Sequence, residues 1–279
     1  MDTAYQSIPL ESRRTTHRCM LGTYEKMGKK MIQVITSFNQ LYYDLIGKDS
    51  VSSFLEYWPR EITLTCYVEG FRMPEHGRIA QVDFSHLESD YFQYQLDTRL
   101  NQSMKKFAKK AYSFMHAMNN PRADWIVWLD ADVITVQTLP IELLQRVLQC
   151  EDLAMYMGVT YVTDKSGNPG SWLVPETGVF AVNTQHEDFA AFRAEYCRRY
   201  RERDYADLRR FYDNDVFGSA LLSVPNASVF DLCARFKKSY KTPLRHTVLG
   251  DHLIHYKAKH SKAEYVQGDV DGICVADND

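Results

Sequence analysis

The stretch Trp125–Val136, WIVWLDADVITV, determines how the rest of the sequence is interpreted. It begins with five apolar residues and then places Asp130 and Asp132 on either side of one alanine. An unbroken apolar run of this length is typical of a parallel strand that is buried on both faces. Ligands bind beyond the carboxyl ends of such strands. The stretch therefore predicts an α/β sheet with a strand that ends at a binding site.

The two aspartates can act on one ligand, because residues two apart in an extended chain point to the same side. Carboxylate oxygens suit Mg²⁺ or Mn²⁺, and these ions usually keep coordination positions for water and substrate phosphates. Asp130 and Asp132 are thus candidate ligands of a metal ion that also binds a diphosphate. The alternative is that they only start a turn or cap the next element.

Strands and helices are predicted to alternate on both sides of this stretch. Upstream, we expect strands in MIQVITSF, which begins at Met31, and in EITLTCYVEG, and helices over 40–57 and 96–118. Downstream, the patterns predict a helix in LPIELLQRVLQC, a strand in DLAMYMGV, a turn-rich loop in TDKSGNPGSW, a strand in PETGVFAVNT, and a helix with Phe189, Phe192, Tyr196 and Tyr200 on one face. This alternation favours a single α/β sheet with both faces covered.

Composition and charge narrow the class of protein. The chain has 279 residues, of which 45% are hydrophobic, enough for one substantial core. A net charge of -3 gives no overall attraction to nucleic acid or membrane. The six cysteines form no C-x-x-C pair and are expected to be reduced. Neither a leader nor a run of about 18 apolar residues is evident, so we expect a cytoplasmic protein, or one of the host cytoplasm if viral.

DWIVWLDADV resembles the D-x-D region of nucleotide-sugar glycosyltransferases of the GT-A fold, and the resemblance extends over about 31–262. It implies one GT-A domain with a central mixed, mostly parallel sheet flanked by helices. We expect that domain over 31–265, after a polar extension over 1–30 and before an acidic tail over 266–279. In the helix upstream, KKFAKKAY resembles a basic segment that reaches the donor in some members. This similarity makes Lys106 and Lys110 donor-binding candidates, unless they form a solvated helix face.

Two further segments carry the resemblance to the sugar side of the site. PETGVFAVNT is similar to the strand at the sugar and acceptor pocket, where Glu176, Thr177 and Gly178 would lie. FYDNDVFGSALL resembles the D-Q-D segment of retaining members related to glycogenin and the galactosyltransferases, which makes Asp213, Asn214 and Asp215 catalytic candidates. Asn214 replaces the glutamine of that pattern and is one methylene shorter. Asp213 has the alternative role of a helix N-cap.

The donor side is completed by the C-terminal segment LIHYKAKHSK, which resembles an H-x-x-G-x-x-K element. The resemblance implies that His255 joins Asp130 and Asp132 around Mn²⁺ or Mg²⁺, and that Lys259 or Lys262 holds the diphosphate. Ala258 stands in the glycine position of the pattern. Contacts to the nucleoside, most simply that of a UDP-sugar, are expected from Thr36 and Ser37 at the end of the first strand and from Glu69 after the second.

The resemblance implies a metal-dependent glycosyltransferase that acts with retention, or with inversion if Asp215 or Glu176 is a general base. The acceptor is open. Residues 235–262 contain eight basic residues and one acid, a net charge of +7, which suits a DNA backbone. A hydroxymethylated DNA base is therefore an alternative to a glycan, lipid-linked or small-molecule acceptor. A metal-dependent phosphohydrolase, a nucleotidyltransferase and a non-enzymatic binding module are the competing classes.

Overall fold

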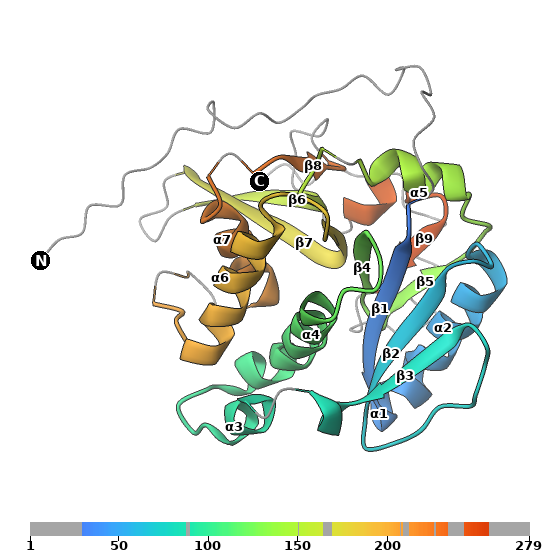
Figure 1. Cartoon of the computed structure of the whole chain (residues 1–279), viewed down its shortest axis with the longest axis horizontal. Coiled ribbons are helices and arrows are strands. Elements are labelled where there is room, and N and C mark those ends of the chain that lie inside the picture. Colours follow the sequence, from blue (N-terminus) through green and yellow to red (C-terminus); the bar gives the residue numbers. More distant parts are fainter. Residues whose placement is uncertain are drawn as a thin grey trace, which may run out of the picture.

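A seven-stranded mixed sheet forms the centre of the molecule (Figure 1). Its strand order is β3-β2-β1-β4-β7-β6-β8, and four of the six neighbouring pairs are parallel. These strands are β1 (Ile32–Asn39), β2 (Thr63–Glu69), β3 (Ile79–Asp83), β4 (Trp125–Leu129), β6 (Ala154–Thr163), β7 (Pro169–Asn183) and β8 (Val229–Asp231). Two short strands, β5 (Val133–Thr135) and β9 (Leu253–His255), pair as a second sheet. The computed structural model describes residues 30–87, 90–149, 151–163, 169–206, 208, 212–225, 227–233 and 243–256.

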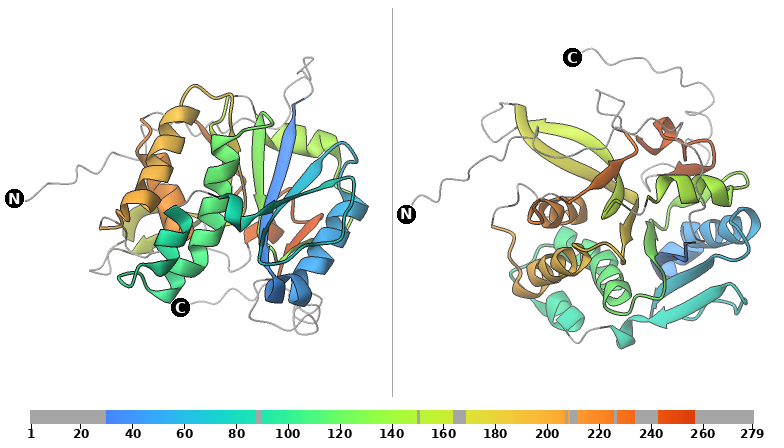
Figure 2. Two further views of the ribbon diagram at one scale, coloured as in Figure 1. Left: turned by 60° about the horizontal axis from the view of Figure 1, so that its bottom comes forward. Right: turned by 45° about the horizontal axis from the view of Figure 1, so that its top comes forward.

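Helices cover both faces of the large sheet, as the views in Figure 2 show. One face packs against α3 (Asp90–Leu96), α4 (Gln102–Asn119), α6 (Phe189–Glu202) and α7 (Asp213–Leu222). The other face packs against α2 (Lys48–Tyr57), α5 (Ile141–Val147) and the small sheet. Shorter turns are α1 (Gln40–Tyr42), the π-helical turn η2 (Tyr43–Gly47), and the 3₁₀ turns η3 (Phe84–His86) and η4 (Pro243–His246). The mixed, mostly parallel α/β fold class is confirmed.

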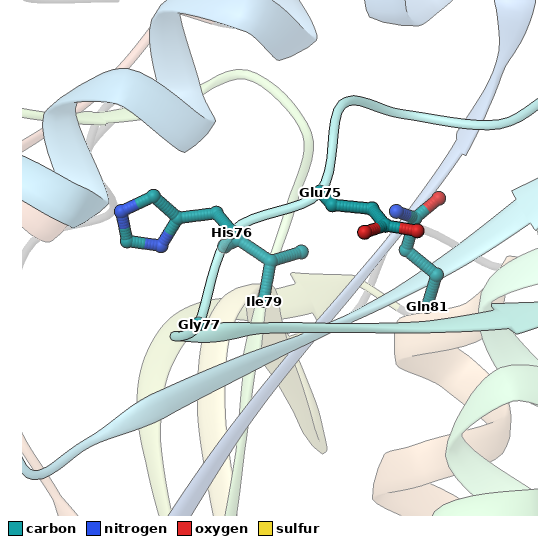
Figure 3. Close-up of a pocket in the computed structure, with 5 residues that line it drawn as sticks. All are labelled: Glu75, His76, Gly77, Ile79 and Gln81. Atoms are coloured by element: carbon teal, nitrogen blue, oxygen red, sulfur yellow. The ribbon is translucent and has the colours of Figure 1, made fainter.

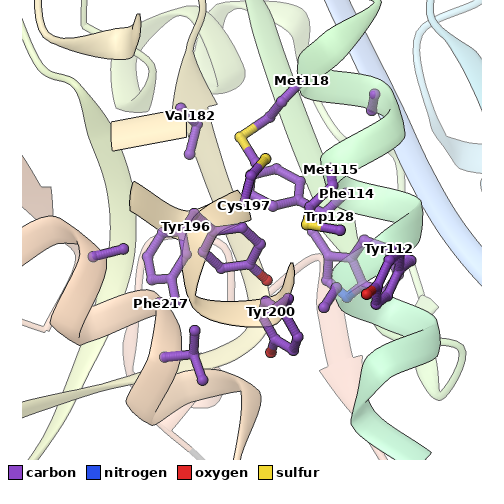
Figure 4. Packing of buried hydrophobic residues seen from close by; sticks show 14 of the residues in the cluster. Tyr112, Phe114, Met115, Met118, Trp128, Val182, Tyr196, Cys197, Tyr200 and Phe217 are labelled. Carbon is purple, nitrogen blue, oxygen red and sulfur yellow. The ribbon is translucent and has the colours of Figure 1, made fainter. Parts of the chain in front are cut away.

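Side-chain alternation along β4 explains its unbroken apolar sequence. Ile126 and Trp128 belong to the core on the α4 side, whereas Trp125, Val127 and Leu129 belong to the core on the α2 side. All five side chains are at most 4% exposed. On the α4 side, aromatic rings from α4, α6 and α7 gather near Trp128 (Figure 4). Burial on both faces is the property that the quoted stretch predicts.

Two predicted boundaries are wrong. The helix predicted over 96–118 begins later, at Gln102 of α4, because the Asn101 side chain accepts a hydrogen bond of 3.0 Å from the Met104 backbone N–H and caps it there. Leu96 is the last residue of the preceding helix α3. The loop predicted in TDKSGNPGSW is shorter, because β7 begins at Pro169 and pairs with β6. The other strands and helices predicted within the described residues are present.

The structure also bears on the cysteines and on the length of the apolar helices. Cys66, Cys197 and Cys233 are buried and form no disulfide, as expected for reduced thiols. Cys19, Cys150 and Cys274 lie outside the described residues, as do the predicted tail and all of the predicted extension except Lys30. Within the part of the chain that the structure describes, no helix combines the length and apolar character that a bilayer crossing requires.

Candidate active site

The D-x-D segment turns sharply at the carboxyl end of β4. The Asp130 backbone N–H donates to the Gly178 carbonyl of the neighbouring strand β7 (2.8 Å), and the Val133 N–H donates back to the Asp130 carbonyl (3.0 Å). The chain then enters β5, where Val133 pairs with His255 of β9. The Tyr256 N–H donates to the Asp132 carbonyl (2.9 Å). These backbone contacts bring His255, distant in the sequence, beside the two aspartates.

Asp130, Asp132 and His255 form a cluster with the spacing of metal ligands. His255 Nε2 lies 3.2 Å from Asp132 Oδ1 and 3.8 Å from Asp130 Oδ2. One ligand atom from each residue can be chosen so that all three lie within 4.8 Å of one another. Two carboxylate oxygens and one imidazole nitrogen are a donor set that suits Mn²⁺ or Mg²⁺. The residues present therefore fit the divalent cation that the sequence predicts.

Gly178 provides the space for the His255 ring. A Cβ atom at position 178 would overlap the imidazole at Cε1 and Nδ1. The nearby Glu176 carboxylate accepts a hydrogen bond from the Gly178 N–H (3.1 Å), and its Oε1 atom lies 3.6 Å from His255 Nδ1. The strand PETGVFAVNT thus contributes a backbone surface and a carboxylate to the same corner of the site.

A buried lysine connects the D-x-D segment to the start of α7. Lys110 Nζ lies 2.9 Å from Asp130 Oδ1 and 2.8 Å from Asp213 Oδ2, and it also donates to the Thr177 carbonyl. The Thr177 hydroxyl donates to Asp213 Oδ2 (2.6 Å), and the Trp128 indole N–H donates to Asp130 Oδ1 (2.7 Å). Residues from α4, β4, β7 and α7 are therefore held in one polar network.

The site carries more negative than positive charge, since the four carboxylates of Asp130, Asp132, Glu176 and Asp213 outnumber the two basic side chains of Lys110 and His255. Burial raises the pKa of Asp130, against the opposing effects of Lys110 and His255. Burial also acts to lower the pKa of Lys110 and of His255, but their carboxylate neighbours outweigh it and raise both pKa values overall. A site with this excess of carboxylates is electrostatically suited to a bound cation.

Asp213 does not cap α7. The N-cap residue is Tyr212, which makes no side-chain capping bond, and the Asp213 side chain is buried against Lys110 and Thr177. Asn214 and Asp215 follow in the first turn and are half-buried. The Asn214 side-chain oxygen accepts from the Asp215 N–H (3.0 Å). The structure thus brings the D-N-D segment to the site through Asp213.

The two lysines of KKFAKKAY have different positions. Lys110 lies in the polar network, whereas Lys106 is exposed, with Nζ 5.9 Å from the Tyr42 ring centre. Lys109, which the sequence reading did not select, forms an ion pair with Glu69 at the end of β2. The sequence interpretation chose Lys106 and Lys110, which are four residues apart on one face of the helix. In the structure the adjacent residues Lys109 and Lys110 reach the ends of strands β2 and β4 instead, and this depends on the tilt of α4.

The nucleoside-side candidates occupy the first two strands. Thr36 is 2% exposed and lies inside β1, three residues before the strand ends at Asn39. Ser37 is half-buried and pairs with Tyr67 of β2. Glu69 also accepts a hydrogen bond from the Tyr91 hydroxyl (3.1 Å). Lys259 and Lys262 lie outside the described residues.

A surface pocket of about 490 Å³ lies elsewhere, at the amino end of β3 (Figure 3). Its lining residues are Glu75, His76, Gly77, Ile79 and Gln81. None of these is a predicted site residue, and the pocket lies at the opposite strand end from the D-x-D segment. It is therefore separate from the candidate active site.

Comparisons with known proteins identify the fold. No protein-family model and no curated protein matches the sequence. Among solved structures, the chain is similar to the galactosyltransferase LgtC in complex with donor and acceptor sugar analogues, with a TM-score of 0.52 and 13% identity over 84% of this chain and 94% of that one. It is also similar to mouse xyloside xylosyltransferase 1, with a TM-score of 0.50 and 12% identity over 72% of this chain and 85% of that one. The chain has the GT-A fold of these glycosyltransferases.

Proposed function

We propose that this protein is a metal-dependent glycosyltransferase that transfers a sugar from a nucleoside-diphosphate sugar to an acceptor hydroxyl. The observation that carries the proposal is the convergence of Asp130, Asp132 and His255 at the carboxyl end of β4 in a GT-A fold. Ligand sites of open α/β sheets lie at this edge. A divalent cation bound there would neutralise charge on the donor diphosphate.

The remaining donor contacts follow from the positions of the first strands. Thr36 and Ser37 belong to β1, which lies beside β4, and Glu69 belongs to β2, the next strand of the sheet. All three are proposed to contact the nucleoside, with UDP as the first choice. Lys259 or Lys262 is proposed to hold the diphosphate. Lys106 is exposed beside the Tyr42 ring and is suited to the outer part of the donor at most.

On the sugar side, Lys110 and Thr177 hold the Asp213 carboxylate in one orientation. We propose that Asp213, Asn214 and Asp215 line the reacting face of the sugar and that transfer retains its configuration. The shorter amide of Asn214 would then approach the sugar from the first turn of α7. If transfer proceeds with inversion, Asp215 or Glu176 is the candidate general base, because each is half-buried at the site.

The test is a panel of nucleoside diphosphates with and without Mn²⁺, read as the melting temperature of the protein. A ligand at about 100 times its Kd stabilises the folded state by about 2.7 kcal/mol, which corresponds to a rise of roughly 5 °C. We expect that rise with UDP and Mn²⁺ together, and a smaller one with either alone. If no nucleoside diphosphate stabilises the protein in Mn²⁺, the proposal fails.

Turnover with the corresponding sugar donors separates the competing classes. UDP-galactose, UDP-glucose and UDP-xylose cover hexosyl and pentosyl transfer, and the anomeric configuration of the product separates retention from inversion. Hydrolysis of the donor to UMP and sugar 1-phosphate without sugar transfer would favour a phosphohydrolase. Transfer of the uridylyl group to an acceptor, with release of sugar 1-phosphate, would favour a nucleotidyltransferase. A protein that binds the donor but releases neither product would be a binding module.

The acceptor is proposed to be a hydroxyl compound, either a glycan or a small molecule. Modified DNA is the alternative that the basic segment 235–262 motivates, although most of its charged residues lie outside the described residues. Replacing Lys237, Lys238 and Lys241 with alanine should flatten the salt dependence of DNA binding by about one unit per lost phosphate contact. Failure to bind duplex DNA at low salt would remove this alternative.

A further inference from the structure

The Glu176 carboxylate lies on the opposite side of the His255 ring from Asp130 and Asp132. Its side chain is 16% exposed, and its Oε1 atom accepts the Gly178 N–H at 3.1 Å and lies 3.6 Å from His255 Nδ1. The opposite ring nitrogen, His255 Nε2, lies 3.2 Å from Asp132. The imidazole is therefore placed between two carboxylates, one on the metal side and one on the β7 side.

This arrangement decides which ring nitrogen can bind a cation. A neutral imidazole has one protonated nitrogen and one with a free lone pair, and the partner of the first fixes the identity of the second. Without a cation, the nearer carboxylate is that of Asp132 on the Nε2 side. A cation held by Asp130 and Asp132 would displace a proton from Nε2, and the carboxylate beside Nδ1 then favours the remaining proton there and leaves Nε2 as the ligand. Nε2 is the nitrogen that faces Asp130 and Asp132.

The backbone of β7 limits how the ring can be placed. Gly178 lies so close to His255 that no Cβ fits between them, and its N–H holds the Glu176 carboxylate. The backbone of His255 is itself fixed, because β9 pairs with β5 directly after the D-x-D segment. The strand, the carboxylate and the ring therefore pack together, with Glu176 Oε1 on the Nδ1 side of the ring.

We infer that Glu176 is a positioning residue for the cation site, which orients His255 Nε2 toward the metal. The inference rests on the proposed function insofar as the cluster binds a divalent cation. It gives Glu176 a different role from the contact to sugar or acceptor expected from the sequence, since its carboxylate is directed to His255 and the Gly178 backbone.

Two substitutions separate orientation from simple electrostatic attraction. Glu176→Gln removes the charge but keeps an oxygen at the same reach, beside Nδ1 and within hydrogen-bonding distance of the Gly178 N–H. Glu176→Asp keeps the charge but withdraws the carboxylate by one methylene. Orientation predicts that the Gln variant binds Mn²⁺ more tightly than the Asp variant, and simple attraction predicts the reverse order.

The experiment is titration of the full chain with Mn²⁺ alone, in which free Mn²⁺ is measured by electron paramagnetic resonance. We expect the Gln variant within about threefold of the unchanged protein, and the Asp variant weaker by about 10- to 100-fold, the usual cost of losing such a contact. Glu61, exposed before β2, supplies the control pair Glu61→Gln and Glu61→Asp, and both should bind as the unchanged protein does.

The outcomes separate the inference from the proposed function. If the unchanged protein binds no Mn²⁺, the metal-dependent function and this inference both fail. If it binds Mn²⁺ but the Asp variant binds at least as tightly as the Gln variant, only the positioning role is overturned. A circular dichroism spectrum of each variant shows that it is folded, and the Gln variant, which is nearly the same shape as glutamate, keeps the test valid if the Asp variant does not fold.

Discussion

At the scale of single residues, the approach of Gly178 to His255 is the tightest requirement of the site. We expect Gly178→Ala to weaken Mn²⁺ binding by about tenfold or more, because the added Cβ must displace the imidazole from Asp130 and Asp132. The matched control is Gly77→Ala, where an added Cβ would have nothing within 4 Å. Equal Mn²⁺ affinity of the two variants would show that the ring can move without loss.

Asp132 is expected to contribute to function at a cost in stability. The Asp132→Asn variant loses one carboxylate from a cluster in which like charges oppose each other, so its free energy of unfolding in the absence of metal should be unchanged or higher. Its rate of sugar transfer should fall by about 100-fold or more, because a metal ligand is lost. Urea unfolding and a transfer assay measure the two quantities. Near-normal transfer in Mn²⁺ would contradict the ligand assignment.

At the scale of secondary-structure elements, Lys110 joins α4 to β4 and α7. Replacing it with methionine leaves Asp130 and Asp213 without their lysine, and the loss of one partner of a buried pair costs about 3 to 5 kcal/mol. We expect Lys110→Met to lower the free energy of unfolding by that amount, measured in urea. The control Lys106→Met, on the exposed face of α4, should change it by about 0.5 kcal/mol at most. Similar losses in both would contradict a stabilising role of the network.

The elements also show what the sequence predicts and what it does not. Strand β4 and its terminal aspartates were predictable, because burial on both faces leaves an unbroken apolar run. The pairing of β5 with β9, which brings His255 to Asp132, joins segments of three residues each that carry no periodic signal. The resemblance to a family motif, rather than the pattern of residues, suggested His255. The contact of Lys109 with Glu69 depends on the tilt of α4, which no local pattern encodes.

At the scale of the whole molecule, the core on the α4 side is rich in tyrosine (Figure 4). Some hydroxyls pair within it, as Tyr94 and Tyr205 do at 2.8 Å. Burial is the largest cause of a raised pKa at seven of these side chains, and for Tyr94 the value is about 12. The seven are Tyr67, Tyr91, Tyr94, Tyr112, Tyr196, Tyr200 and Tyr205.

These tyrosines predict a steep loss of stability in alkali. Their pKa values in the folded protein exceed the unfolded value near 10, so the folded state keeps protons that the unfolded state releases. The stabilising effect is complete below pH 10 and is lost as the pH rises above it, by about 1.4 kcal/mol per tyrosine and pH unit. We expect the absorbance of these tyrosinates at 295 nm to appear only together with loss of the far-ultraviolet circular dichroism signal. Ionisation of all tyrosines before that signal changes would contradict their burial.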